Sequence, residues 1–175
     1  VAIQYDKYND RNGKFEYYKK FNFTIERDMK YVFFERNDDS DMEFEETGFD
    51  GLYMVKMKPI ADERGHFFRT YCANEFGSIG MNEHFVQMNQ SFNKSPGTLR
   101  GMHAQAGVAA EIKFVRCLSG KVFDVVVDLR KDSSTYLQYF GIELFGGDFK
   151  GLLIPRGFVH GFITLEMDST LLYHH

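Results

Sequence analysis

The chain has 175 residues, the size of one domain or of one domain with an appendage. Hydrophobic residues make up 43% and charged residues 26%, proportions that exclude wholesale disorder. The net charge of −4 argues against a nucleic-acid-binding surface, and no apolar run approaches the ~18 residues that a membrane span needs.

Residues 1–41 form a separate segment, with charges of both signs and ten aromatic residues, which is too aromatic for a solvated tail. The segment contains no motif, and an acidic cluster at Asp38, Asp39 and Asp41 marks its end. We expect an extension that packs on the core or on a partner subunit. The alternative is a piece of a larger protein cut at this point.

From residue 42 onwards the pattern is typical of β structure. Strand-like segments at 51–57 and 66–71 flank a charged turn at 62–65. Residues 73–81 are the only good helix candidate in this part of the chain. The turn-forming residues at 91–97 predict a loop.

The strongest predicted strand covers residues 121–129, where Val122, Asp124, Val126 and Asp128 alternate with a second face. Later strands are separated by Gly and Pro. Many short strands with almost no helix predict an all-β sandwich or barrel. With only two cysteines, Cys72 and Cys117, a disulfide framework is not expected and a reducing cytoplasm is the simplest location.

His103 follows the predicted loop at the start of another strand. Alternation places it with Gly101 and Gln105 on one face, opposite Met102 and Ala104. A polar row of this kind inside a small barrel indicates a lined cavity. From spacing alone, a structural histidine with satisfied hydrogen bonds explains the pattern equally well.

Lys113 shares a face with Val115, so it is expected to point inward, which is costly unless the ammonium meets an anion. Taken alone, a solvated strand face is the simpler interpretation. Further on, His160 lies in an apolar setting beside Gly161, which allows close backbone approach. Tyr173 lies in an apolar strand, where its hydroxyl needs a partner.

Together these segments resemble the dTDP-4-dehydrorhamnose 3,5-epimerase family, a cupin family, over residues 42–175. The matching segments are DERG at 62–65, FVQMNQS at 85–91, TLRGMHAQ at 98–105, KFVRC at 113–117, GKVFDVVVDLR at 120–130, SSTY at 133–136 and IPRGFVHGF at 154–162. The resemblance implies a cupin jelly-roll barrel, usually a homodimer, that acts without a metal or a redox cofactor.

The implied substrate is a nucleoside-diphosphate 4-keto-6-deoxy sugar whose C3, C5 or both are inverted through an enolate, for deoxysugar and polysaccharide synthesis. By resemblance, His103 is the base, Lys113 holds the C4 oxygen and Tyr173 protonates the opposite face. The implied substrate-binding residues are Arg64, Arg69, Gln87, Asn89, Arg100 and His160.

The chain departs from the family pattern in four places. In the family, a C-terminal segment supplies a carboxylate that orients the catalytic histidine. We do not expect this segment among the 175 residues. Ala104 replaces an aromatic residue, Arg69 replaces a glutamate and Met88 replaces an aspartate. Whether C3, C5 or both are inverted, and for which sugar and nucleotide, does not follow from these residues.

Two alternatives come from other classes of protein. A metal cupin would use His103 and His160, but Gln105 occupies the usual position of a second histidine, and Lys113 would repel a cation. A non-catalytic sugar-nucleotide-binding or assembly module is the other alternative, favoured by the missing segment.

Overall fold

The computed structural model describes residues 4–9, 15–20 and 40–175 of the chain. The chain divides into two units, Val1–Asn37 and Asp38–His175. In the first unit, strands β1 (Gln4–Asn9) and β2 (Phe15–Lys20) pair as an antiparallel ribbon. The second unit holds all the segments that the sequence analysis singled out for chemistry.

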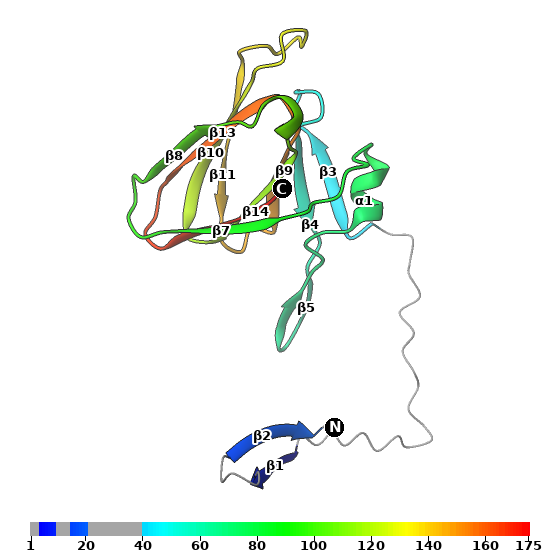
Figure 1. Cartoon of the computed structure of the whole chain (residues 1–175), viewed down its shortest axis with the longest axis vertical. Helices are drawn as coiled ribbons and strands as arrows, with labels where there is room; N and C mark the ends of the chain where they lie inside the picture. The colour runs from blue at the N-terminus through cyan, green and yellow to red at the C-terminus, as the bar shows by residue number, and fades with distance from the viewer. Residues whose placement is uncertain (1–3, 10–14, 21–39) are drawn as a thin grey trace. The chain divides into compact units, whose positions relative to one another are not determined.

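Two antiparallel sheets form the main body of the second unit (Figure 1). Their strands are β3 (Met42–Glu46), β4 (Tyr53–Met57), β7 (Met88–Asn93), β8 (Leu99–His103), β9 (Lys113–Ser119), β10 (Lys121–Asp128), β11 (Tyr139–Phe145), β12 (Lys150–Ile154), β13 (Phe158–Thr164) and β14 (Ser169–His174). One sheet has the order β3-β4-β12-β9-β14-β7 and the other has the order β11-β10-β13-β8. The all-β fold class predicted from the sequence is confirmed.

The two sheets face each other and enclose an apolar core. Strand β10 shows how the sequence builds it, because every second residue of this strand is buried. Val122 and Val126 enter the core, and Asp124 and Asp128 lie on the same buried face. The alternation predicted for this strand is therefore confirmed, and it brings two carboxylates into the interior.

A second apolar cluster covers the outer face of the six-stranded sheet and includes helix α1 (Ala73–Ser78). The helix lies within the candidate segment 73–81, which was expected to form one or two turns, and it ends before Gly80, which has a φ of +85°. The Gly80 amide donates to the Gly77 carbonyl, and the Met81 amide donates to the Phe76 carbonyl. This pattern ends a helix, and it packs Met81 and Phe76 into one cluster.

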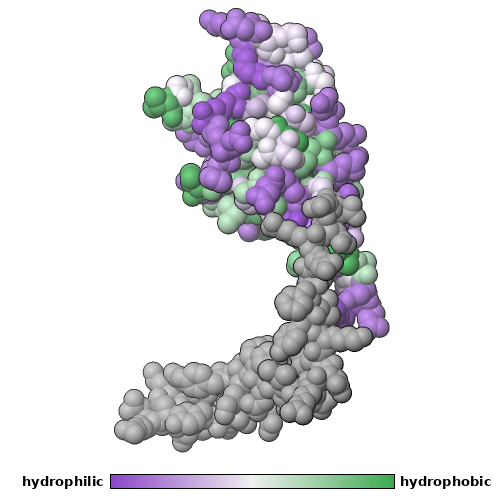
Figure 2. Space-filling model, turned by 90° about the vertical axis from the view of Figure 1, so that its right-hand side faces the viewer, coloured by the Kyte–Doolittle hydropathy of each residue, from purple (hydrophilic) through white to green (hydrophobic). Residues whose placement is uncertain are grey.

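A short hairpin of β5 (Ile60–Asp62) and β6 (Gly65–Phe67) projects from the barrel (Figure 1). All six of its strand residues are exposed, including the apolar Ile60 and Phe67. Elsewhere the visible described surface is mainly hydrophilic, with scattered apolar spots (Figure 2). Among the described residues, no helix is long and apolar enough to cross a membrane.

Candidate active site

A cavity of about 560 Å³ opens between the two sheets. Strand β8 and its neighbour β13 supply one wall, and strands β7, β9 and β14 supply the other (Figure 1). The lining residues are Asn89, Ser91, Leu99, Arg100, Gly101, His103, Lys113, His160, Gly161, Phe162, Tyr173 and His175. Six of the nine residues singled out from the sequence therefore share one cavity.

His103 lies at the end of β8, opposite His160 of β13. Strict alternation would place Arg100 and His103, three residues apart, on opposite faces of the strand. The register shifts between the His160 and Phe162 pairs, so that both Arg100 and His103 line the cavity. An irregularity of this kind re-aims side chains, and simple alternation does not predict it.

Two glycines allow the close approach of β8 and β13. A Cβ atom on Gly161 would lie 2.9 Å from the Arg100 carbonyl oxygen and 3.2 Å from the Cα of Gly101. Gly101 itself has a φ of +125°, which side chains rarely adopt. The close backbone contact expected at Gly161 is therefore present, and it carries Arg100 and His103 to the cavity wall.

His160 is fixed by a carboxylate on β10. Its Nε2 lies 3.0 Å and 2.9 Å from the two carboxylate oxygens of Asp124, and both side chains are buried. A carboxylate in this position fixes the orientation of the imidazole. Asp124 was not among the functional residues expected from the sequence, because its face of β10 alternates Val with Asp, and only the structure shows that this face is buried. A buried carboxylate needs a partner, and His160 supplies it.

Tyr173 lies on β14, in the sheet opposite His103. Its hydroxyl is 3.0 Å from the Ser91 Oγ on the neighbouring strand β7. Burial raises the pKa of Tyr173 to about 12, and the Ser91 hydrogen bond offsets only part of that rise. The phenol is therefore protonated at neutral pH and available as a proton donor.

Arg100 belongs to the same polar network. Its Nε donates to the Asn93 Oδ1 at 2.6 Å, and the Asn93 amide donates to the Ser169 carbonyl at 3.1 Å and to the Ser91 Oγ at 3.4 Å. The network connects the guanidinium with the Tyr173 hydroxyl through Ser91. These hydrogen bonds restrict the rotamers of the three network residues that line the cavity, Ser91, Arg100 and Tyr173.

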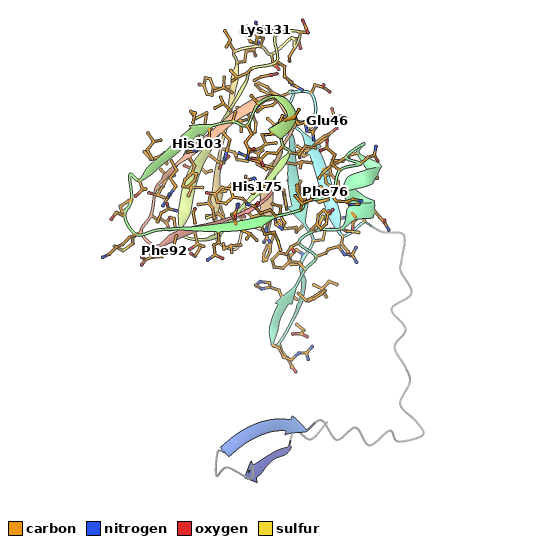
Figure 3. The ribbon with its side chains drawn as sticks, viewed as in Figure 1. Glu46, Phe76, Phe92, His103, Lys131 and His175 are labelled. Atoms are coloured by element: carbon orange, nitrogen blue, oxygen red, sulfur yellow. The ribbon has the colours of Figure 1, made fainter. Side chains whose placement is uncertain are left out.

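Lys113 begins β9 and lines the cavity, and the next residues on its face, Val115 and Cys117, lie in the barrel core. Its Nζ is 3.1 Å from the Glu111 Oε1. The inward orientation predicted from alternation thus has an anionic partner. His175, which no sequence pattern indicated, also lines the cavity (Figure 3).

Three of the residues expected to bind substrate do not line this cavity. Arg64 lies in the turn of the β5–β6 hairpin, where it pairs with Asp62. Arg69 pairs with Asp41 and Glu75. The side chain of Gln87 is exposed, and its backbone pairs with that of His175.

Strand β7 is longer than the sequence suggested. The segment 91–97, expected to be a loop, contributes its first three residues to β7. Ser91 and Asn93 thereby become ordered strand residues that support the cavity wall, because β7 pairs along its whole length with β14.

Among residues 40–175, no group of three or more His, Cys, Asp or Glu side chains is arranged to hold a metal ion.

Comparisons with known proteins agree with this architecture. The family model described as dTDP-4-dehydrorhamnose 3,5-epimerase matches residues 46–175. The dTDP-4-dehydrorhamnose 3,5-epimerase of Salmonella typhimurium is 43% identical over 128 residues, which cover 73% of this chain and 69% of that protein. The enzyme of the same name from Pseudomonas aeruginosa is 42% identical over 123 residues, which cover 70% of this chain and 67% of that protein.

Solved structures give the same result. The dTDP-4-dehydrorhamnose 3,5-epimerase of Elizabethkingia anophelis superposes with a TM-score of 0.74 at 38% identity, covering 77% of this chain and 74% of that one. The dTDP-6-deoxy-D-glucose-3,5-epimerase of Legionella pneumophila was solved in complex with dTDP-4-keto-L-rhamnose. It superposes with a TM-score of 0.72 at 36% identity, covering 76% of this chain and 70% of that one. The chain belongs to the dTDP-4-dehydrorhamnose 3,5-epimerase family.

Proposed function

We propose that this protein is an epimerase that inverts C3, C5 or both of a nucleoside-diphosphate 4-keto-6-deoxy sugar through an enolate. One observation carries the proposal. An imidazole, an ammonium and a protonated phenol, on His103, Lys113 and Tyr173, line one cavity and come from both of its walls. The Legionella relative was solved with a dTDP-linked 4-keto sugar bound.

His103 is the proposed base. A hydrogen on the carbon next to a ketone becomes acidic because the resulting carbanion is delocalised onto the ketone oxygen. A neutral imidazole has a ring nitrogen with a free lone pair, so His103 can accept this proton, and general-base catalysis contributes roughly 10²–10⁴-fold to the rate. Its place at the cavity wall on β8 leaves the ring accessible to a bound sugar.

Lys113 is the proposed partner of the ketone oxygen. Negative charge develops on this oxygen when the enolate forms, and a fixed donor there contributes on the order of 3–4 kcal/mol to the transition state. The largely buried side chain of Lys113 provides an ammonium group in a setting where solvent screens it little.

Tyr173 is the proposed acid. Inversion requires a proton donor on the face of the sugar opposite the base, and Tyr173 lies on the sheet opposite β8. Its phenol can donate its proton to the enolate carbon, which restores the ketone with inverted configuration. Ser91 holds the phenol oxygen before the transfer, and its hydroxyl can donate a hydrogen bond to the phenolate that the transfer leaves.

The sugar and phosphate groups are proposed to be bound from the cavity wall by Arg100, Asn89 and His160.

We further propose a homodimer, because Arg64 and Arg69 lie off the cavity of their own chain. The exposed apolar residues of the β5–β6 hairpin, Ile60 and Phe67, suit contact with a second copy that receives Arg64. The free thiols of Cys72 and Cys117 suit the reducing cytoplasm.

The test is incubation of the purified protein with dTDP-4-keto-6-deoxyglucose in deuterated water, followed by proton NMR of the sugar. We expect loss of the C3 or C5 hydrogen signals and the appearance of an inverted product. Saturable binding of the sugar nucleotide without any hydrogen exchange would contradict the proposed catalysis and indicate a non-catalytic binding module.

A further inference from the structure

Glu111 lies behind the cavity wall and contacts two residues of that wall. It is not itself a lining residue. Its Oε1 is 3.1 Å from the Lys113 Nζ and 3.2 Å from the His175 Nδ1. The exposed fractions of the three side chains are 19% for Glu111, 14% for Lys113 and 16% for His175. One carboxylate oxygen therefore holds two nitrogen groups that face the substrate space.

The backbone of His175 is fixed by hydrogen bonds to the segment before β7. Its amide donates to the Gln87 carbonyl at 2.8 Å, and its carbonyl accepts from the amides of Val86 and Gln87 at 2.7 Å and 3.2 Å. The imidazole stacks on the ring of Tyr173 with centroids 6.1 Å apart. The ring is thus held between the proposed acid and Glu111.

The charge state of Glu111 follows from these neighbours. Burial alone would raise its pKa, but the neighbouring ammonium of Lys113, together with His175, brings the pKa below its usual value. Glu111 is therefore ionised at neutral pH. The Glu111 Oε1 lies within ion-pair distance of Lys113 and His175 but makes no hydrogen bond among the described residues.

We propose that Glu111 is a positioning residue, which holds the ammonium of Lys113 and the imidazole of His175 at the cavity wall so that Lys113 meets the ketone oxygen. This inference rests on the proposed function of Lys113. A lysine side chain has four rotatable carbon–carbon bonds, so an ammonium without an anchor samples many positions. Glu111 removes that freedom without touching the substrate.

The experiment compares Glu111→Ala and Glu111→Gln with the wild type. Misplacement of a reacting group by about 1 Å can cost roughly 100-fold, so we expect kcat of Glu111→Ala to fall by about 10- to 100-fold, with a smaller change in KM. Glu111→Gln keeps an oxygen acceptor for the ammonium, and we expect it to recover most of the loss. Glu143→Ala, which removes a carboxylate paired with Lys121 away from the cavity, is the control and should leave kcat unchanged.

A second measurement is independent of turnover. Mass spectrometry after brief treatment with an amine-acylating reagent reports the reactivity of Lys113, which should rise in Glu111→Ala relative to the wild type and to Glu143→Ala. A kcat of Glu111→Ala within twofold of wild type, a Glu111→Gln variant as impaired as Glu111→Ala, or unchanged Lys113 labelling would each overturn the inference. An inactive wild type would instead refute the proposed function, and the labelling result alone would then decide the role of Glu111.

Discussion

At the scale of single residues, the site depends on partners that the lining side chains do not reveal by themselves. Asp124 fixes His160, Ser91 fixes the Tyr173 hydroxyl, and Asn93 fixes Arg100. Asp124 and Ser91 each lie on the strand next to their partner in the same sheet, whereas Asn93 of β7 reaches across to Arg100 of β8 in the other sheet. The orientation of the cavity groups is thus a consequence of strand pairing as much as of the lining residues themselves.

Replacing Tyr173 with Phe should separate proton removal from inversion. The variant keeps the buried ring but loses the donor on the face opposite His103. We expect inversion to fall by about 10²–10⁴-fold, while exchange of the substrate hydrogen with solvent deuterium continues with retained configuration. NMR of the recovered sugar distinguishes the two processes. Ser91→Ala, which leaves the phenol in place, should lose far less, and equal loss of exchange and inversion in Tyr173→Phe would contradict this role.

The lining residues could be predicted from the sequence to different degrees. Alternation places Lys113 on the face of Val115, but a solvated face is the simpler interpretation from the residues alone. The apolar strand around Tyr173 indicates only that its hydroxyl needs a partner. Asp124 shares a face with Val122 and Val126, but its partner His160 is 36 positions away, and only the pairing of β10 with β13 joins them. His175 reaches the site through hydrogen bonds to Gln87, for which no sequence pattern exists.

At the scale of elements, the contact between β8 and β13 determines where His103 and Arg100 lie. Gly161→Ala would place a Cβ atom against the backbone of β8. We expect a loss of about 1–3 kcal/mol in the free energy of unfolding, from overpacking, together with reduced epimerisation. Urea denaturation measures the first effect. Gly77→Ala has no atom within 4 Å of the new Cβ and should not be destabilised, so equal losses in the two variants would refute the explanation.

Strand β10 ends at a buried carboxylate, that of Asp128, which receives hydrogen bonds from the following turn and whose ionisation supports the fold. Burial alone would raise the pKa of Asp128, but hydrogen bonds from Arg130, Ser133 and Thr135 hold it well below its usual range. A depressed pKa in the folded state stabilises the protein above the unfolded-state value of about 3.9, and this contribution is lost as the pH falls further.

Asp128→Asn should therefore lower the free energy of unfolding by roughly 1.5–3 kcal/mol at pH 7, because it removes hydrogen bonds to a charged group. The difference from wild type should shrink as the pH falls below the unfolded-state pKa. Denaturant titrations at neutral and acidic pH measure this change. Asp132→Asn, at an exposed position in the same turn, is the matched control. A difference that does not vary with pH would contradict the assignment.

The strands were easier to predict than their irregularities. The period of two predicts β10 to within one residue of its limits, but not which face is buried: the face with Val122 and Val126 is buried although it also carries two aspartates. The shift in β8 was not predictable, since it depends on which residue of β13 lies opposite. The extent of β7 was missed because Ser91 and Asn93 favour turns when their partner strand is unknown.

At the scale of the whole molecule, the proposed dimer predicts a shared active site. His103→Asn and Arg64→Ala should each impair the homodimer. A heterodimer of the two would contain one site with both native residues, if Arg64 enters the cavity of its partner. Refolding equal amounts of the two variants together gives about half heterodimers, each with one intact site of two. This mixture should therefore contain about one quarter of the intact sites of the wild type. Activity no higher than the mean of the two parents would refute the shared site.

The central claim is that His103 removes a proton from the carbon beside the ketone of a nucleotide-linked sugar. Deuterium incorporation from solvent into dTDP-4-keto-6-deoxyglucose, followed by NMR for wild type and His103→Asn, tests it most directly. We predict rapid incorporation by the wild type and a rate lower by about 10²–10⁴-fold in the variant, whose amide cannot accept the proton. Incorporation by His103→Asn at the wild-type rate would contradict the claim.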